Sequence, residues 1–211
     1  MSEAPTTRTE VDVRAALVAE TARLLDEGGP EAVSVRRLAD AVGTSTMAVY
    51  THFGGKPELL RAVCSEGFRQ LGRRLDRVRP TDDPVADLLG CARAYRRAAH
   101  ANPHLFRAMF SRPVTDVLVD PAEQAAALET FLVLVRTVER GMAAGRLAGG
   151  DADEVALELW SAVHGLVSIE LGAGVQSARQ AERALAGLVR HLAVGLGDDP
   201  DRAAASVPAP R

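Results

Sequence analysis

Aromatic residues and signals for β-strands are scarce in this chain of 211 residues. Phe, Trp and Tyr together make up 4% of it, whereas Ala, Leu and Arg are abundant. Because these three residues form helices readily, the composition favours an all-helical protein. A chain of this length can bury roughly 70% of the surface of its unfolded state. Its length therefore suits a small N-terminal head followed by a larger body.

Cysteine is also rare, and long apolar runs are missing. Cys64 and Cys91 have no metal-ligand spacing and fall in helical apolar patterns. This favours two buried, reduced thiols and leaves a redox switch as the alternative. The first ten residues, MSEAPTTRTE, have no apolar core like that of a signal peptide, and no run of 18 apolar residues occurs. We therefore expect a soluble, cytoplasmic protein with no membrane segment.

Positive charge is not in excess, because the net charge is −3. This argues against a general binder of polyanions. The charge is uneven, with net −3 over residues 1–55, net +4 over 56–80 and net −4 over 81–211. Any contact with nucleic acid must therefore depend on a local group of cations and should weaken with salt. The cations in question are Arg36, Arg37, Lys56 and Arg61.

Apolar periodicity and helix-stop residues predict nine helices. They cover about 9–27, 34–42, 45–52, 57–78, 84–101, 103–110, 121–146, 151–171 and 177–196. The first should end at Gly28-Gly29-Pro30, since glycine accepts a left-handed cap and proline cannot continue a helix. Three helices form a head, residues 9–56, and six form a body, residues 57–196. Residues 1–8 and 197–211 are polar, without periodicity, and are expected to be flexible ends.

Residues 34–56 have the pattern of two short helices joined by a glycine turn. Four apolar residues share one face of the first helix, namely Val35, Leu38, Ala39 and Val42. Gly43 supplies the turn, and Val49 and Phe53 form the inner face of the second helix. This is the layout of a helix-turn-helix, which places its second helix in the major groove of DNA. An ordinary helical hairpin fits the same spacing.

The outer face of the second helix is small and adaptable rather than charged. It presents Thr44, Ser45, Thr46, Met47, Tyr50 and Thr51. Hydroxyl groups can bond base edges, and Thr methyl groups or a Met side chain can contact a thymine methyl. Tyr50, His52 and Lys56 can bind phosphates, which positions the helix without reading sequence. Arg36, at the start of the first helix, can reach a guanine edge or a phosphate.

Residues 9–61 resemble the N-terminal head of TetR-type transcriptional regulators. The resemblance is carried by the stripe of the first helix, AVSVRRLA at 32–39, Gly43, and AVYTHF at 48–53 followed by KPELL at 56–60. The sequence departs from the family at Thr51, where an aromatic residue is common. This departure alters a contact on the phosphate side and leaves the fold unchanged. The resemblance implies a DNA-binding regulator with a helix-turn-helix.

The body resembles, more loosely, the subgroup of this family that is named for its Trp-His-Gly element. Trp160-Ser-Ala-Val-His164-Gly165 carries this resemblance, together with Asn102-Pro103 and the spacing of Phe106, Met109 and Phe110. It implies a ligand cavity among the fifth to eighth helices. The candidate ligand contacts are Tyr95, Phe106, Met109, Phe110, Phe131, Trp160 and His164, with Leu105 and Met142 as further candidates. Each of them fits a plain core position as well, and His164 fits a buried histidine bonded to a backbone carbonyl.

The same resemblance implies a homodimer with a two-helix interface from each subunit. The last two predicted helices are rich in small residues, which let helices approach closely, and in leucines, which supply buried area. A monomer core fits these residues too. A dimer would place two recognition helices about 34–36 Å apart, on the half-sites of a pseudo-palindromic double-stranded DNA operator.

No catalytic, metal or cofactor motif competes with this interpretation. His100 and His104 are four residues apart, but Pro103 interrupts the helix that would bring them to one face. No nucleophile elbow or dinucleotide fingerprint occurs. The sequence therefore predicts a repressor, not an enzyme, that is released from DNA by a small apolar or amphipathic effector. A helical protein acting through protein partners, and an enzyme on a helical bundle, are the alternatives. The effector, the operator, the regulated genes and the choice between repression and activation are open.

Overall fold

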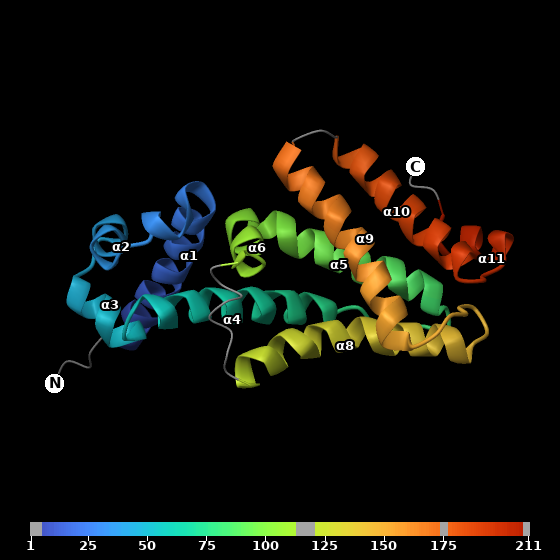
Figure 1. Ribbon diagram of the computed structural model, residues 1–211, viewed down its shortest axis with the longest axis horizontal. Coiled ribbons are helices and arrows are strands. Elements are labelled where there is room, and N and C mark those ends of the chain that lie inside the picture. The colour runs from blue at the N-terminus through green and yellow to red at the C-terminus, as the bar shows by residue number, and fades with distance from the viewer. Residues whose placement is uncertain (1–5, 113–120, 174–176, 209–211) are drawn as a thin grey trace. The chain divides into compact units, whose positions relative to one another are not determined.

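The computed structural model describes residues 6–112, 121–173 and 177–208, and all the regular structure in these ranges is helical (Figure 1). The helices are α1 (Thr6–Ala32), α2 (Val35–Val42), α3 (Thr46–Phe53), α4 (Lys56–Leu75), α5 (Pro84–Ala101), α6 (Pro103–Met109), α8 (Pro121–Ala143), α9 (Ala152–Ala173), α10 (Ala178–Gly195) and α11 (Pro200–Ser206). The prediction of an all-helical protein is confirmed. Each of the nine predicted helices has a counterpart, and α11 is additional.

The chain divides into two compact units. The first comprises Met1–Arg69 and Asn102–Ala126, and the second comprises Gln70–Ala101 and Ala127–Arg211. The first unit therefore holds α1–α3, most of α4, and α6, although α6 follows α5 directly in the chain. The predicted division at residues 56 and 57 into a DNA-binding and a ligand-binding domain stays a prediction.

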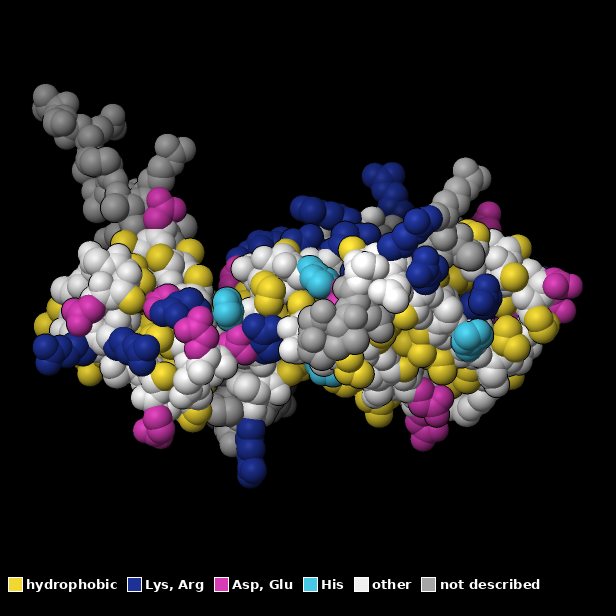
Figure 2. Space-filling model, turned by 90° about the horizontal axis from the view of Figure 1, so that it is seen from above, with side chains coloured by type: hydrophobic (Ala, Val, Ile, Leu, Met, Phe, Trp, Pro, Cys, Tyr) yellow, Lys and Arg dark blue, Asp and Glu magenta, His cyan; other side chains and the backbone are white. Residues whose placement is uncertain are grey.

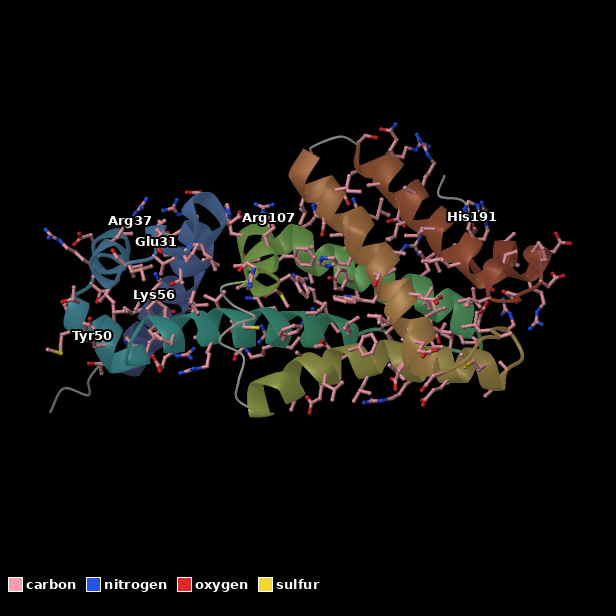
Figure 3. All side chains as sticks on the ribbon, viewed as in Figure 1. Glu31, Arg37, Tyr50, Lys56, Arg107 and His191 are labelled. Carbon is pink, nitrogen blue, oxygen red and sulfur yellow. The ribbon has the colours of Figure 1, made fainter. Side chains whose placement is uncertain are left out.

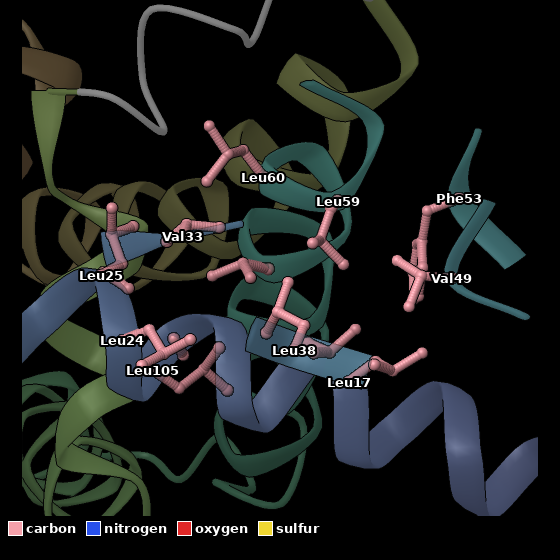
Figure 4. Close-up of a cluster of buried hydrophobic side chains, with 14 of the residues drawn as sticks. Leu17, Leu24, Leu25, Val33, Leu38, Val49, Phe53, Leu59, Leu60 and Leu105 are labelled. Atoms are coloured by element: carbon pink, nitrogen blue, oxygen red, sulfur yellow. The ribbon is translucent and has the colours of Figure 1, made fainter. Parts of the chain in front are cut away.

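The first unit has an apolar core to which all of its helices contribute. Leu17 and Leu24 of α1, Leu38 of α2 and Leu59 of α4 are at most 1% exposed. Figure 4 shows how these side chains gather together with those of α3 and α6. The cluster also includes Leu25, Val33, Val49, Phe53, Leu60, Val63 and Leu105. Because α6 contributes Leu105 to this core, α6 packs in one body with α1–α4.

Helix α1 is broken where the sequence predicts its end. Gly29 has φ 69° and ψ −172°, which is a conformation that L-residues with side chains rarely adopt, and Pro30 follows it. The helical turn after the break, up to Ala32, leads directly into the core residue Val33. The break therefore redirects the chain toward α2.

A charged cluster joins α1 to α6. The carboxylate of Asp26 accepts hydrogen bonds from Arg107 Nε at 2.7 Å and Arg107 Nη2 at 2.6 Å. His104 Nδ1 lies 2.7 Å from the same carboxylate. Hydrogen bonds from Arg107, followed by that from His104, hold the pKa of Asp26 below its ordinary value, against the opposing effect of burial. The cluster therefore favours the charged form of Asp26.

Replacing Asp26 by alanine should lower the free energy of unfolding by about 1.5–3 kcal/mol, the range for hydrogen bonds to charged groups. The contribution of Asp26 is complete above the ordinary aspartate pKa of about 3.9. It is lost as the pH falls through the lowered pKa of the folded state. Urea unfolding at pH 7 and at acidic pH measures both effects. Glu27→Ala is a matched control, because the exposed Glu27 pairs with Arg23 of the same helix and, among the described residues, has no ion pair to another helix. Equal losses for the two variants would contradict the prediction.

The second unit is held together by ion pairs as well as by apolar contacts. Arg96 of α5 donates to Glu170 of α9 at 2.8 and 2.6 Å, and Arg93 donates to Glu182 of α10 at 2.6 Å. His100 Nε2 lies 2.9 Å from the Glu170 carboxylate. Figure 1 shows α9 and α10 as neighbours in this unit, in agreement with the contacts between them. Ion pairs thus join α5 to both α9 and α10.

The C-terminal region differs from the prediction of a flexible end at 197–211. Asp199 caps α11 by accepting hydrogen bonds from the N–H groups of Asp201 and Arg202. Ala203 and Val207 are buried, at 0% and 1% exposure. This part of the end is therefore a packed helix, while residues 1–5 and 209–211 of the predicted flexible ends lie outside the described residues.

Candidate functional site

Backbone capping sets the geometry of the α2–α3 pair. Ser34 caps α2 by accepting a hydrogen bond from Arg37 N at 3.3 Å. At the other end Gly43 has φ 72°, and the N–H groups of Gly43 and Thr44 bond the carbonyls of Asp40 and Ala39. This pair of bonds is the Schellman motif, which places a residue in the left-handed conformation after a helix. The predicted glycine turn is therefore present, and it directs the chain into α3.

Helix α3 has one buried and one exposed face, as its sequence predicts. Val49 and Phe53 are 0% and 7% exposed and belong to the core of the first unit (Figure 4). Met47 and Tyr50 are 71% and 52% exposed, and Figure 3 shows Tyr50 on this helix at the outer end of the unit. Large side chains that remain this exposed on a short helix are free to contact a partner.

The other side chains predicted to contact DNA from α3 differ in their exposure and in the hydrogen bonds that they already make. Thr46 is exposed. Ser45 caps α3, with its Oγ accepting from Ala48 N at 3.0 Å, and Thr51 Oγ1 donates to Met47 O at 2.9 Å. Ser45 can therefore still donate its hydroxyl proton, and Thr51 Oγ1 can still accept. Thr44 and His52 are half-buried.

Lys56 has a structural contact that its place in the sequence does not indicate. Its ammonium donates to the carbonyl of Pro30 at 2.6 Å, which joins the start of α4 to the end of α1. Figure 3 labels Lys56 and Tyr50 in this unit. A lysine ammonium has three N–H donors, so two remain for a further acceptor. Lys56 can therefore contact a phosphate while its ammonium keeps the hydrogen bond to the Pro30 carbonyl.

Basic side chains around α2 and α3 are few and mixed with acidic ones. Arg36 and Arg37 of α2 are both exposed. Arg14 of α1, which sequence reasoning did not select, lies with its guanidinium 5.2 Å from the centre of the Phe53 ring. On the left of Figure 2, over the first unit, blue and magenta side chains are interspersed. The one sequence feature that could have indicated this contact is the position of Arg14, one helical turn before Leu17 of the apolar stripe.

The predicted ligand contacts fall into two groups, one in each unit. Phe106, Met109 and Phe110 belong to the first unit. There the rings of Phe106 and Phe110 lie 5.3 Å apart, and Phe110 also meets Phe68 at 6.0 Å. Met109 packs directly over Gly67, where an added Cβ would come within 2.7 Å of its sulfur. These residues form part of the packing between α4 and α6.

The other four predicted contacts come together in the second unit. The Tyr95 hydroxyl lies 2.7 Å from His164 Nδ1, and the rings of Trp160 and His164 lie 5.3 Å apart. Phe131 meets Trp160 edge to face at 6.5 Å. Burial raises the pKa of Tyr95 and lowers the pKa of His164. At neutral pH the pair is therefore a phenol and a neutral imidazole, whose Nδ1 can accept a hydrogen bond from the phenol O–H. We call Tyr95, Phe131, Trp160 and His164 the aromatic cluster.

Other residues considered in the sequence have ordinary partners. Cys64 and Cys91 are both buried free thiols, and burial raises the pKa of Cys91 to about 11. His100 and His104 bind different carboxylates, those of Glu170 and Asp26. Within the described ranges, no three His, Cys, Asp or Glu side chains are grouped as a metal site would require.

Comparisons with known proteins match both halves of the chain. Residues 17–63 match the profile described as bacterial regulatory proteins of the tetR family, and residues 88–192 match that of the tetracyclin repressor-like C-terminal domain. An uncharacterized HTH-type transcriptional regulator from Mycobacterium tuberculosis is 30% identical over 186 residues, which cover 87% of this chain and 81% of that protein.

Solved structures show the same fold. The TetR family transcriptional regulator PfmR from Thermus thermophilus has a TM-score of 0.69 at 23% identity, covering 82% of this chain and 97% of that one. RolR in complex with its ligand resorcinol has a TM-score of 0.60 at 18% identity, covering 97% and 98%. At identities this low, the similarity shows a shared fold, which is the same arrangement of helices.

Proposed function

Because this chain belongs to the TetR family of DNA-binding transcriptional regulators, which is a non-enzymatic family, we propose that it is a repressor released from its operator by a small-molecule effector. The observation that carries the proposal is the exposed face of α3, on a helix whose opposite face is fixed in the core. A major groove about 12 Å wide admits one such helix. Membership of the Trp-His-Gly subgroup stays a prediction.

We assign base contacts to the start of α3 and phosphate contacts to its surroundings. Thr46 and Met47 are the exposed side chains suited to base edges and to thymine methyl groups. Ser45 and Thr51 have fewer free hydrogen-bonding positions and Thr44 is half-buried, so these three residues assist them. The phosphate contacts come from Tyr50, His52, Lys56 and Arg36. This division follows the general rule that phosphate contacts position a protein, whereas base contacts specify the sequence.

We further propose a homodimer formed through α9 and α10. Leu157 and Ile169 of α9 are 50% and 59% exposed, although both are large and apolar. Residues Ala152–Gly172 are long and apolar enough to cross a membrane by length and composition alone, and only 28% of their most apolar window is buried. In a cytoplasmic protein, a second copy of the chain would cover this apolar face. The two-fold symmetry of such a dimer would match a pseudo-palindromic operator.

The aromatic cluster is the effector site in this proposal. It combines apolar rings with a polar pair, Tyr95 and His164, which is the usual composition of small-molecule sites. RolR, which shares the fold, binds resorcinol. A small apolar or amphipathic effector with a hydrogen-bonding group fits this chemistry. Phe106 and Met109 of α6 and the following Phe110 pack on α4, and we assign them to the change that the effector causes in the first unit.

Operator binding is tested by fluorescence anisotropy with fragments of the DNA upstream of the gene. Tyr50→Phe should weaken binding to all fragments by about two- to tenfold, the cost of one hydrogen bond. Thr46→Ala and Met47→Ala should instead change which fragments are preferred. Binding of every fragment should fall steeply with salt. An absence of any sequence-specific, salt-sensitive binding would overturn the proposal, and identical effects of all three variants would overturn the division of contacts.

Release by an effector is tested on the same complexes. A library of small phenols and other amphipathic compounds is added, and the effector is expected to weaken operator binding roughly 5- to 150-fold, the usual range of allosteric coupling. Tighter binding in the presence of the compound would identify a co-repressor, and increased transcription on operator binding would identify an activator.

A further inference from the structure

A recess of about 210 Å³ opens in the second unit between α5 and α8. It is lined by Val78 and Pro80 from the segment after α4, Asp87 and Cys91 of α5, and Val133, Arg136, Thr137 and Arg140 of α8. None of these residues belongs to the aromatic cluster. The recess therefore has a different set of lining residues from the proposed effector site, and the proposed function gives it no role.

A buried carboxylate fixes one side of the recess. The Asp87 side chain is 6% exposed and accepts hydrogen bonds from Thr81 N and Thr81 Oγ1, both at 2.8 Å. Arg140 Nη2 donates to the same carboxylate at 2.8 Å and also to the carbonyl of Thr81. Among the described residues, both bonds of Arg140 use Nη2. Its Nε–H and Nη1–H groups therefore remain for a ligand. Asp87 thus orients Arg140 and balances its charge.

A second guanidinium adds a positive charge that the recess does not balance. Arg136 is exposed and lies four residues before Arg140, so the two project from one face of α8. In the described ranges Arg136 has no ion pair, whereas Arg140 is paired with Asp87. The lining residues therefore carry one net positive charge. A guanidinium binds a carboxylate through two parallel hydrogen bonds.

The remainder of the recess is apolar. Val78, Pro80 and Val133 supply hydrocarbon walls. The Thr137 hydroxyl donates to the Val133 carbonyl within its own helix at 2.9 Å, and the buried Cys91 thiol is uncharged because burial raises its pKa to about 11. The interior therefore suits an apolar group, and its volume is below the 300–1,000 Å³ that is typical for drug-sized ligands.

We propose that this recess binds a small monocarboxylic acid with an apolar body. The carboxylate lies between Arg136 and Arg140, and the body of the acid contacts Val78 and Val133. The single net positive charge favours a monoanion over a phosphate monoester, which carries nearly two negative charges at neutral pH. The proposal goes beyond the repressor function, because the site is separate from the effector site and its occupancy does not require DNA.

Isothermal titration calorimetry on the full chain tests the site, with benzoate and hexanoate as probes. Benzamide and hexanamide are the uncharged controls. Each acid should bind once per chain, more weakly at high salt, and each amide should bind at least about tenfold more weakly, as expected when a charge-assisted hydrogen bond is lost. Arg136→Gln should weaken both acids by a similar factor. Arg97→Gln, which changes an exposed arginine of α5 outside the recess, should leave binding unchanged.

A second variant separates the site from effects on folding. Val133→Phe should fill the recess and abolish binding of both acids, while circular dichroism reports whether the helices are retained. The proposal is wrong if neither acid binds the wild-type chain, or if Arg136→Gln binds both acids as the wild type does. It is also wrong if Trp160→Phe, and not Arg136→Gln, removes binding, because the acids would then occupy the aromatic cluster. Operator binding plays no part in these measurements, so the two proposals can fail independently.

Discussion

Replacing Leu157 and Ile169 of α9 together by glutamate should convert the proposed dimer to a monomer. It should also weaken operator binding by about 10²- to 10⁴-fold, the usual gain from a second linked binding module. The two side chains are half or more exposed, and Gly165 lies between them on the helix. A Cβ added at Gly165 would meet no atom within 4 Å, so the space above it is open to another helix. A charge placed in such a packed apolar interface would be buried without a partner.

Sedimentation velocity measures the assembly of this double variant, and fluorescence anisotropy measures its binding to the operator. Leu128→Glu is a matched control, because Leu128 of α8 is 54% exposed and lies outside the proposed interface. The control should remain a dimer with operator binding close to that of the wild type. A dimeric double variant with unchanged operator binding would exclude the interface through α9.

Replacing Arg146 by alanine should have the largest effect on stability, about 3–5 kcal/mol, because it leaves a buried carboxylate without its partner. Arg146 is 6% exposed and donates to Asp198 at 2.6 and 2.7 Å. It also reaches Asp83 at 3.1 Å and Ser206 Oγ at 2.9 Å. The same residue therefore joins the start of α5, the end of α10 and α11.

Urea unfolding followed by circular dichroism measures the loss. Arg93→Ala is the matched control, because its pair with Glu182 is 38% and 25% exposed and should contribute at most about 1 kcal/mol. The double variant Arg146→Met with Asp198→Leu should recover much of the stability, since well-packed apolar residues can replace a buried pair. If Arg146→Ala lowers the free energy of unfolding no more than Arg93→Ala does, the pair of Arg146 with Asp198 does not determine stability.

Local sequence signals were sufficient to predict most of the fold. Ser34, Gly43 and Ser45 cap their helices through bonds that span three to five residues, so their roles can be inferred from short patterns. The burial of Val49 and Phe53 follows from helical periodicity alone. Helix α11 has too few residues to show apolar periodicity, although Asp199 and Pro200 form a local signal for its start. The bond that joins it to Arg146, 60 residues earlier in the chain, has no signal in the sequence.

The candidate site was less predictable, because its details depend on contacts between distant residues. The bond from Lys56 to Pro30 spans 26 residues, and that between Tyr95 and His164 spans 69. Sequence spacing indicates which side chains have suitable chemistry, but it does not show which of them already have a partner. For the same reason the seven predicted ligand contacts could not be divided between the two units from the sequence.

The aromatic cluster has a practical consequence for study of the protein. Trp160 is the one tryptophan of the chain, and it lies against the rings of His164 and Phe131. Its emission therefore reports on a single environment, at the position proposed for the effector. The proposed recognition helix α3 contains no tryptophan. The protein thus contains an intrinsic fluorophore that can follow occupancy of the effector site without labelling, while a dye on the DNA follows operator binding separately.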